Sequence, residues 1–420
     1  MEMDMDAAPL MAFPQFDAED DAAFDAAPDT MTAPATHGFG VSACKSAKIV
    51  EHLRNARYDA PTLLLDVAMV GRQYDKLARG ASPAEVFYAV KANPEREILE
   101  TLVRRGSRFD VASRGEIDLV LAAGATAEAV SFGNTIKKSR DIAYARQIGV
   151  DLFVFDSEEE LHKIAAEAPG AEVFCRLLIE HSQAEWPLSR KFGCSSEEAV
   201  RLLSMAKGLG LRAGGMSFHA GSQAREAVMW TGALDTAAAA YGMARSAGLE
   251  LTMLNLGGGF PAEYLQAVPD TEQYARDVIA LAQSRFGELP GRLMIEPGRG
   301  MVAEAGMIVA ETVLVSRKSP TDLNRWVYLD IGKFGGLAET IDEAIRYRIE
   351  TPHDGGATGP CILAGPTCDS ADVLYEKRPM ALPMGLRAGD PIRIVCTGAY
   401  TTTYASIAFN GIAPLDVVCL

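Results

Sequence analysis

The chain has 420 residues, of which 48% are hydrophobic and 23% are charged. This composition supplies enough apolar side chains for one large core or two ordinary ones, and it excludes a chain that is disordered throughout. The formal net charge is −16, from 40 Lys and Arg against 56 Asp and Glu. Such acidity argues against a nucleic-acid partner and is compatible with a cationic small molecule.

The acidity is concentrated at the start of the chain. Nine Asp and Glu, and no Lys or Arg, precede Lys45, and this stretch is rich in Ala, Asp, Pro and Met without sustained periodicity. The pattern predicts a disordered acidic extension over residues 1–44. A short partner-binding motif within it is the less favoured alternative.

The seven cysteines are an odd number and show no C-x-x-C spacing, so the sequence suggests neither a disulfide framework nor a zinc site. A reducing compartment fits this pattern. No basic segment leads into an apolar run near the N-terminus, and no stretch approaches 18 uninterrupted apolar residues. We therefore expect a cytoplasmic protein with no metal and no membrane partner.

Residues 45–65 form a leading segment that ends in the strand-like run Thr62–Leu65. This run could add a strand to the domain that follows it, or the segment could pack on the C-terminal domain. From residue 85 onward, β-branched or aromatic runs alternate with Ala-, Leu- and Glu-rich stretches of helical length, such as Arg114–Ala123, Ser157–Ala168 and Glu226–Ser246. The predicted strands are Glu85–Val90, Arg108–Ala112, Ala129–Gly133, Leu152–Asp156, Glu172–Ile179, Gly214–His219, Met253–Leu256 and Arg292–Ile295.

Eight βα units at this spacing favour a closed (β/α)8 barrel over an open doubly wound sheet. After Gly300 the pattern changes to strand-like runs broken by Gly and Pro, with a long loop at 351–360. These runs are Met307–Val315, Trp326–Asp330 and Pro391–Cys396. The predicted domains are therefore a barrel over residues 66–304 and a β domain, barrel-like or a sandwich, over 305–420.

Enzymes with this barrel build their sites from the loops that follow the strands. Lys91 follows the apolar run Val86–Val90, so its amine should emerge from a low-dielectric floor that favours the neutral, nucleophilic form. That environment suits a Schiff-base lysine. For a single lysine at a strand end, reaching out to solvent is the commoner alternative.

Three consecutive glycines, Gly257–Gly259, can bring backbone N–H groups close to an anion because no Cβ intervenes. Tight turns use such glycines equally often. Ser222 and Arg299 follow neighbouring predicted strands and can add a hydroxyl group and a guanidinium fork. Their coincidence favours a phosphate cradle, in the usual position for phosphate in such barrels.

Glu296 ends an apolar strand, where its carboxylate could pair with a protonated ring nitrogen, and His219 could stack on a flat ring. For either residue alone, a buried structural role is at least as common. A lysine, a phosphate cradle and a buried carboxylate in one barrel mouth together indicate pyridoxal 5'-phosphate. The lysine forms an imine with its aldehyde, and the carboxylate keeps the pyridinium protonated so that the ring acts as an electron sink.

Seven motifs, in order along residues 58–420, closely resemble the fold type III, pyridoxal-phosphate-dependent decarboxylases of basic amino acids, and among these the bacterial ornithine or lysine/ornithine decarboxylases. The motifs are Phe87–Asn93, Phe109–Ser113, Ser217–Ser222, Gly257–Pro261, Glu296–Arg299, Gly365–Asp369 and Gly398–Thr401. The acidic extension lies outside the resemblance.

The resemblance implies a head-to-tail homodimer with two active sites at its interface. It identifies Lys91 as the Schiff-base lysine, Glu296 as the partner of the pyridinium and His219 as the residue stacked on the ring. These three and Cys368 form the predicted catalytic set. The residues expected to bind the cofactor are Lys91, Asp110, Glu116, Arg176, His219, Ser222, Gly258, Gly259, Glu296, Gly298, Arg299 and Tyr400.

Cys368 and Asp369 are implied to come from the other subunit. Cys368 would donate a proton to the carbanion left when CO2 departs, and Asp369 would bind the distal ammonium of the substrate together with Asp342. Lys191 and Asp372 match positions that pair across the dimer interface in this family.

Two carboxylates facing a terminal ammonium suit L-ornithine, converted to putrescine and CO2 for polyamine biosynthesis, and also L-lysine, converted to cadaverine. The two substrates differ by one methylene, worth only about 1–3 kcal/mol in a pocket. The stretch Asp330–Leu337 departs from the eukaryotic ornithine enzymes, which bears on the depth of the distal pocket. The alternatives are an arginine or diaminopimelate decarboxylase, a fold III racemase, which should lack the Cys368–Asp369 pair, and an inactive regulatory homologue, which should have lost Lys91 or the cradle.

Overall fold

The computed structural model describes residues 39–179 and 191–420. Most of the predicted acidic extension, residues 1–38, lies outside the described residues. Its last residues, 39–44, run along the β domain, where the Ser42 hydroxyl donates to both carboxylate oxygens of Glu350 at 2.9 and 2.8 Å.

Eight parallel strands form a closed barrel, as the sequence predicted. Each strand pairs with the next along the chain, and the last pairs with the first, with Val86 opposite Ile295. The strands are β2 (Glu85–Ala89), β3 (Arg108–Val111), β4 (Val130–Phe132), β5 (Leu152–Phe155), β6 (Glu172–Arg176), β7 (Arg212–Ser217), β8 (Met253–Asn255) and β9 (Arg292–Ile295).

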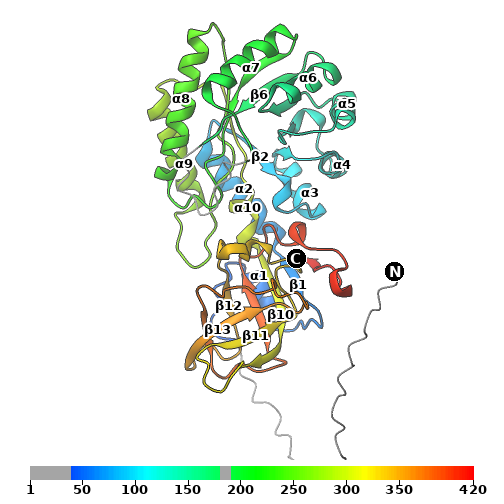
Figure 1. Cartoon of the computed structure of the whole chain (residues 1–420), viewed down its shortest axis with the longest axis vertical. Helices are drawn as coiled ribbons and strands as arrows, with labels where there is room; N and C mark the ends of the chain where they lie inside the picture. Colours follow the sequence, from blue (N-terminus) through cyan, green and yellow to red (C-terminus); the bar gives the residue numbers. More distant parts are fainter. Residues whose placement is uncertain (1–38, 180–190) are drawn as a thin grey trace, which may run out of the picture. The chain divides into compact units, whose positions relative to one another are not determined.

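Helices follow the barrel strands and cover the outside of the barrel (Figure 1). They are α2 (Val67–Ala81), which precedes β2, α3 (Arg96–Arg104), α4 (Arg114–Ala122), α5 (Ser139–Gln147), α6 (Glu158–Glu167), α7 (Ser196–Gly208), α8 (Thr231–Ser246) and α9 (Thr271–Phe286). The short α-helix α10 (Arg299–Val302) and the 3-10 helices η1 (Val90–Ala92), η2 (Ala127–Ala129), η3 (Ala227–Trp230) and η4 (Ala303–Ala305) complete this domain.

Serine caps fix where several helices begin. The Ser113 hydroxyl accepts from the backbone N–H of Glu116 at the start of α4, and Ser157 does the same for Glu160 at the start of α6. A serine followed three residues later by glutamate is a sequence signature of a helix N-terminus, and here the serine hydroxyl satisfies an N–H group that the helix leaves unpaired. The predicted helix starts at these two positions are therefore close to the observed ones.

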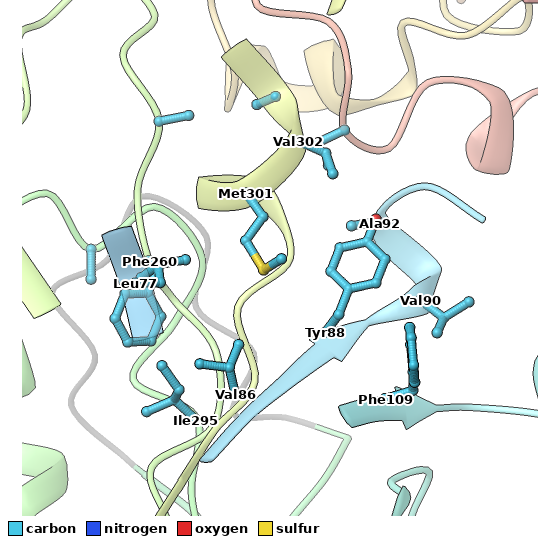
Figure 2. Packing of buried hydrophobic residues seen from close by; sticks show 14 of the residues in the cluster. Leu77, Val86, Tyr88, Val90, Ala92, Phe109, Phe260, Ile295, Met301 and Val302 are labelled. Carbon is cyan, nitrogen blue, oxygen red and sulfur yellow. The ribbon is translucent and has the colours of Figure 1, made fainter. Parts of the chain in front are cut away.

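Alternation along the strands separates the barrel interior from its outer layer. Phe87 lies in the interior with Leu152, Val154, Phe174, Met253 and Met294. Its neighbours Val86 and Tyr88 face the outer core, and Figure 2 shows Val86 beside Ile295 of the adjacent strand. The filled interior gives the barrel a closed apolar floor, and η1 continues from β2 at the opposite, polar end.

The second domain is built on an eight-stranded sheet, which confirms the predicted β domain. One path through the sheet runs β12-β15-β10-β11-β13-β14. Its strands are β10 (Gly306–Ser316), β11 (Arg325–Leu329), β12 (Arg348–Glu350), β13 (Thr358–Ala364), β14 (Met380–Pro383), β15 (Pro391–Val395) and β16 (Asp416–Cys419), joined by β1 (Thr62–Leu65). Three short turns connect them, η5 (Ala338–Glu343), η6 (Thr402–Tyr404) and η7 (Phe409–Gly411), and α1 (Ala47–His52) precedes β1.

Strand β1 belongs to this sheet and not to the barrel. It pairs antiparallel with β10 and parallel with β16, and Figure 1 shows its blue arrow among the strands of the second domain. The expectation that it adds a strand to the barrel is wrong, because the pairing of β2 with β9 leaves the barrel no free edge. All four residues of β1 are buried.

The loop after β15 joins the β domain to the barrel mouth. The backbone N–H of Tyr400 donates to the carbonyl of Ala92 at 2.8 Å, and the Asn93 amide donates to the carbonyl of Gly398 at 2.8 Å. These bonds hold the loop against the turn that carries Lys91. In the part of the chain that the structure describes, no helix has the length and apolar character needed to cross a bilayer.

Candidate active site in the barrel mouth

Lys91 lies in η1, directly after β2, and its Nζ donates to Asp110 Oδ2 at 3.0 Å. Asp110 lies near the end of β3 and beside this turn, because Ala89 and Asp110 are opposite each other in the sheet. Its carboxylate is 3% exposed, and its Oδ1 has no hydrogen-bond partner among the described residues. A Cβ at Gly133 would lie 1.7 Å from that oxygen, so the glycine makes room for the carboxylate.

The charge of Lys91 differs from the sequence expectation. Burial lowers its pKa, but the negative charge of Asp110, with contributions from Tyr400 and Glu296, outweighs burial and raises the pKa above its ordinary value. The direction of this shift favours an ammonium ion in the chain alone, contrary to the expectation of a neutral amine. The polar neighbours, which the strand sequence does not reveal, decide the protonation.

Glu296 follows β9 and accepts a hydrogen bond from the Asn255 amide, Nδ2 to Oε1, at 2.5 Å. Burial and the nearby charge of Asp110 raise the pKa of Glu296 to about 7, although Lys91, Asn255 and Arg176 act in the opposite direction. A carboxyl group held this way is half-protonated near neutral pH. A cationic partner placed beside it would favour the carboxylate form.

His219 is a neutral imidazole. Burial and the charges of Arg176 and Lys91 lower its pKa well below the usual value. The backbone N–H of Gly221 donates to Nδ1 at 2.9 Å, which leaves the ring proton on Nε2. A Cβ at Gly258 would lie 3.1 Å from Nε2, so the glycine allows the ring to sit against the β8 loop.

The predicted phosphate cradle is assembled around Arg299. The Ser222 hydroxyl accepts from Arg299 Nε at 3.3 Å and Nη2 at 3.1 Å. Gly259 has φ of +123°, and a Cβ there would lie 2.7 Å from the carbonyl oxygen of Gly221. The bare backbone is thus needed for the two loops to approach each other, and it leaves no side chain over the cradle.

Three further predicted residues border the same mouth. Glu116 accepts from the Ala112 N–H at 2.7 Å, and burial raises its pKa. The Tyr400 ring centre lies 5.0 Å from the guanidinium carbon of Arg299. A Cβ at Gly298 would lie 3.2 Å from the Tyr400 hydroxyl and 2.9 Å from the Ala92 Cβ. The barrel and the β domain therefore both supply walls of the site.

Cys368 and Asp369 lie exposed on the β domain, and their described contacts stay within that domain. Cys368 Sγ accepts from the Asn410 amide at 3.2 Å, and the Cys368 N–H donates to Asn410 Oδ1 at 3.1 Å. Asp369 accepts from the Ala371 N–H at 2.8 Å. The structure of one chain does not bring them into the network around Lys91.

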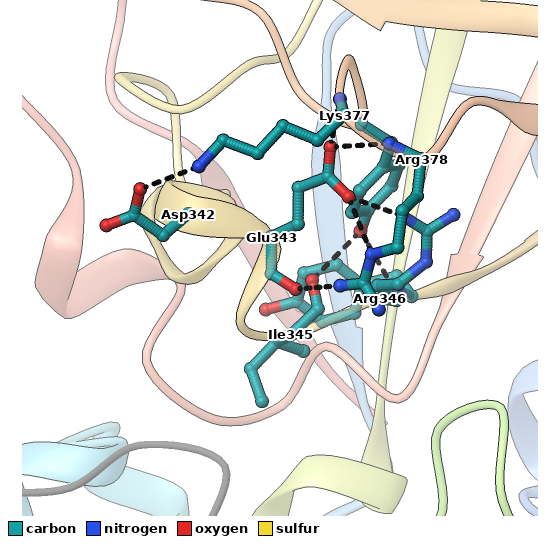
Figure 3. A network of polar contacts seen from close by, with 8 residues as sticks. Asp342, Glu343, Ile345, Arg346, Lys377 and Arg378 are labelled. Carbon is teal, nitrogen blue, oxygen red and sulfur yellow. Dashed lines mark hydrogen bonds and ion pairs between the residues drawn. The ribbon is translucent and has the colours of Figure 1, made fainter.

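Asp342 and Glu343, side by side in η5, have opposite environments (Figure 3). The Asp342 side chain is 84% exposed and pairs with Lys377 at 3.2 Å, whereas Glu343 is buried. Glu343 accepts from Arg346 at 2.8 Å and from Arg378 Nε at 3.1 Å. Burial raises the pKa of Glu343, but hydrogen bonds from Arg378 and Lys377 lower it below its ordinary value. Both carboxylates line a cavity of about 320 Å³ that also includes Gln223 and Arg225.

The two residues predicted at a dimer interface differ in exposure. Lys191 is exposed, with Nζ 4.8 Å from the centre of the Phe192 ring. Asp372 is 2% exposed and accepts from the Thr367 hydroxyl at 2.7 Å and from the Lys333 N–H at 2.8 Å. Their pairing stays a prediction, and the internal bonds of Asp372 argue against it.

Sequence reasoning missed several residues of the site. Asn255 ends β8, so the rule that strand ends carry function could have found it. Tyr264 and Glu339 bind Arg299. Tyr264 lies in a loop, and Glu339 and the buried Glu343 lie in η5; neither segment carries a recognisable motif. No signal in the chain marks them, because their partners are distant in sequence.

The residues of the mouth fit a phosphorylated aldehyde with a basic ring. An amine lies beside an unsatisfied carboxylate oxygen, a guanidinium and a hydroxyl group lie by bare glycine backbone, and a carboxyl of raised pKa can hold a ring proton. This set of donors and acceptors matches pyridoxal phosphate.

Comparisons with known proteins agree with this fit. Residues 67–303 match the family described as pyridoxal-dependent decarboxylase, pyridoxal binding domain. The chain is 33% identical over 360 residues to the lysine/ornithine decarboxylase of Selenomonas ruminantium, which covers 84% of this chain and 88% of that protein.

Solved structures give the same result. The lysine/ornithine decarboxylase of Vibrio vulnificus, complexed with cadaverine, superposes with a TM-score of 0.78 at 32% identity over 89% of this chain and 99% of that one. The arginine decarboxylase of Paramecium bursaria Chlorella virus reaches a TM-score of 0.79 at 26% identity, over 89% of this chain and 99% of that one. The chain therefore belongs to the pyridoxal-dependent decarboxylases, and its cofactor is pyridoxal phosphate.

Proposed function

We propose that this enzyme decarboxylates L-ornithine to putrescine and CO2, with L-lysine to cadaverine as a second reaction, and that it serves polyamine biosynthesis. The observation that carries the proposal is the Lys91–Asp110 pair in the same barrel mouth as the Arg299–Ser222 cradle and Glu296. The two relatives named lysine/ornithine decarboxylases support the substrate class.

In this proposal Lys91 holds the cofactor through its amine, and Arg299, Ser222 and the glycines Gly258 and Gly259 hold its phosphate. When bound, the cofactor supplies an electron sink for the electron pair that the departing carboxylate leaves on the substrate. Tyr400 closes the phosphate side from the β domain.

The chain's own residues position the cofactor and set the protonation of its ring nitrogen. Asp110 positions the Lys91 side chain before the cofactor binds, and Glu296 would keep a proton at the ring nitrogen because a buried carboxylate is stabilised by an adjacent cation. Neutral His219 offers a flat face against the ring without adding positive charge. Arg176 and Glu116 complete the charged surroundings.

The substrate side of the proposal requires a homodimer. Cys368 of one subunit protonates the substrate carbon in the site of the other, and Asp369 binds the distal ammonium there. Asp342 is the second carboxylate for that ammonium, and its exposed position beside the 320 Å³ cavity supports access to a ligand.

The decisive experiment compares kcat/KM for ornithine, lysine, arginine and diaminopimelate on one preparation, with the amine product identified. We expect ornithine to be preferred and lysine to follow within about 10–200-fold, because one methylene separates them. A preference for diaminopimelate contradicts the assignment of Asp342 and Asp369 to a distal ammonium.

The matched control is the variant Lys91→Ala. It should lose both the visible absorbance of the bound cofactor and the release of CO2, because no other group in the proposal holds the cofactor covalently. Release of CO2 at the wild-type rate by this variant contradicts the proposed role of Lys91.

A further inference from the structure

Glu339 is a buried carboxylate that the reaction as proposed does not use. It lies in η5 of the β domain, and the side chains of Glu339 and Arg299 are 6% and 4% exposed. Arg299 Nη1 donates to Glu339 Oε2 at 2.6 Å, and Arg299 Nη2 donates to Oε1. The contact is thus a two-bond fork between a guanidinium and a carboxylate, which is the strongest form of this pair.

The guanidinium of Arg299 divides its donors between two sides. Nε and Nη2 face Ser222, on the side of the cradle proposed for phosphate. Nη1 and Nη2 face Glu339, and Nη1 also donates to the Tyr264 hydroxyl at 2.6 Å. A carboxylate therefore occupies one edge of the same cation whose other edge is offered to the cofactor.

The position of Arg299 does not depend on Glu339 alone. Tyr264 and Ser222 bind the guanidinium, and the Tyr400 ring lies 5.0 Å from its carbon. No other group in these contacts can replace the negative charge of Glu339, because Tyr264, Ser222 and Tyr400 contact the guanidinium with neutral hydroxyl groups or a ring. Removing Glu339 should thus change the charge of the cradle more than its shape.

We propose that Glu339 is the counter-ion of Arg299 in the chain without cofactor. Glu339 holds the buried guanidinium in the cradle before the cofactor binds, and it lowers the affinity of the cradle for the cofactor phosphate. A buried arginine without a counter-ion is unfavourable, so Glu339 stabilises the cofactor-free chain. A phosphate dianion that arrives at the other edge meets a cation already neutralised and is repelled by the carboxylate. This inference rests on the proposed placement of the phosphate at Arg299.

The test removes the charge with Glu339→Gln. The enzyme is stripped of cofactor with hydroxylamine and titrated with pyridoxal phosphate and, separately, with pyridoxal, which lacks the phosphate; binding is followed by protein fluorescence. We expect the variant to bind pyridoxal phosphate about tenfold more tightly and to bind pyridoxal as the wild type does. Weaker or unchanged binding of pyridoxal phosphate, or an equal change for both ligands, overturns the proposal.

Glu343→Gln is the matched control. Glu343 is a buried carboxylate in the same turn and is also paired with arginines, but the pairs are with Arg346 and Arg378 and not with Arg299. This control should not distinguish pyridoxal phosphate from pyridoxal. If it tightens binding of the phosphorylated ligand as Glu339→Gln does, the effect is not specific to Arg299 and the proposal fails.

A second measurement covers the case in which Glu339→Gln folds poorly without cofactor. Inorganic phosphate can replace the missing counter-ion, so it should raise the melting temperature of the cofactor-free variant more than that of the cofactor-free wild type, and it should improve the yield of folded variant. An equal response of the two proteins to phosphate overturns the proposal.

The variant Arg299→Met separates this inference from the proposed function. If Arg299 holds the phosphate, the variant weakens binding of pyridoxal phosphate and leaves pyridoxal unaffected. If Arg299→Met binds both pyridoxal phosphate and pyridoxal as tightly as the wild type does, the placement of the phosphate at Arg299 is contradicted. A phosphate-specific loss in Arg299→Met, together with no phosphate-specific change in Glu339→Gln, rejects only the role of Glu339.

Discussion

Glu296 carries a buried carboxyl group whose pKa is raised to about 7, mainly by burial and by Asp110. In the unfolded chain this group loses its proton at about pH 4.5, the ordinary value. Its contribution to stability is therefore complete below that pH and is lost as the pH rises through the folded value. The loss amounts to about 3 kcal/mol.

This behaviour predicts that Glu296→Gln flattens the pH dependence of stability in the cofactor-free protein. Urea unfolding at about pH 5 and about pH 8 should show the wild type losing stability relative to the variant as the pH rises. Glu343→Gln should leave the slope between these two pH values nearly unchanged, because the fold lowers the pKa of Glu343 below its ordinary value and the carboxyl group is ionised there in both the folded and the unfolded chain. Parallel curves for the wild type and Glu296→Gln contradict the raised pKa.

Cys368 presents an exposed thiol next to Asn410, outside the contact network of Lys91 in the same chain. Replacement by alanine should slow turnover about 100-fold or misdirect protonation of the product, because a positioned acid contributes on that scale. Cofactor binding, read from visible absorbance, should be retained. Loss of the cofactor in Cys368→Ala assigns the residue a structural role.

At the scale of elements, the contact between η1, which carries Lys91, and the loop after β15 joins the barrel and the β domain into one site. Asn93 follows η1, is 1% exposed, donates to the carbonyl of Gly398 and accepts from the Glu95 N–H at 3.1 Å. Asn93→Ala removes both bonds and leaves a carbonyl without this donor, which should cost about 1–3 kcal/mol of stability. It should also lower kcat, because the Lys91 turn loses its tie to the loop of Tyr400.

Asn134→Ala is the matched control for that prediction. Asn134 also follows a barrel strand, donates to the Ala112 carbonyl at 3.1 Å and accepts from the Ile136 N–H at 3.3 Å, with both bonds inside the barrel. Chemical unfolding and kcat should separate the two variants. If both lose stability and activity equally, the bond between the domains has no special role.

At the scale of elements, the sequence was a good guide wherever local pattern decides structure. The eight barrel strands and the ends that carry Lys91, Asp110 and Glu296 follow from apolar runs and from the rule that parallel strands present their carboxyl ends together. The run Thr62–Leu65 was identified as a strand, but a run of one threonine and three leucines does not determine which sheet it joins. Long-range pairing decides that question.

The same limit applies to the site. Glu339 meets its partner Arg299 only when η5 is folded against α10. The protonation of Lys91 depends on carboxylates from other strands. One of the buried bonds of Asp372 likewise comes from the loop of Lys333, 39 residues away in sequence. Residue type and motif predicted which groups are present, whereas tertiary contacts determine their charge and their partners.

For the whole molecule, the proposed homodimer explains why one chain divides its candidate catalytic residues between two places. The Lys91 network is assembled in the barrel mouth, and Cys368 lies exposed on the β domain. A symmetric head-to-tail pair can place each exposed thiol at the other subunit's mouth. Each complete site then contains Lys91 from one chain and Cys368 from its partner.

This arrangement predicts recovery of activity when two defective variants are mixed. Lys91→Ala and Cys368→Ala homodimers each lack one part in both sites, but a mixed dimer contains one intact site. If subunits exchange freely in an equal mixture, half of the dimers are mixed, and activity should rise to about a quarter of the wild-type value. Size-exclusion chromatography with light scattering checks the dimer, and CO2 release measures the recovery. If the activity of the mixture only equals the mean of the activities of the two separate variants, then Lys91 of one chain and Cys368 of its partner do not form one site.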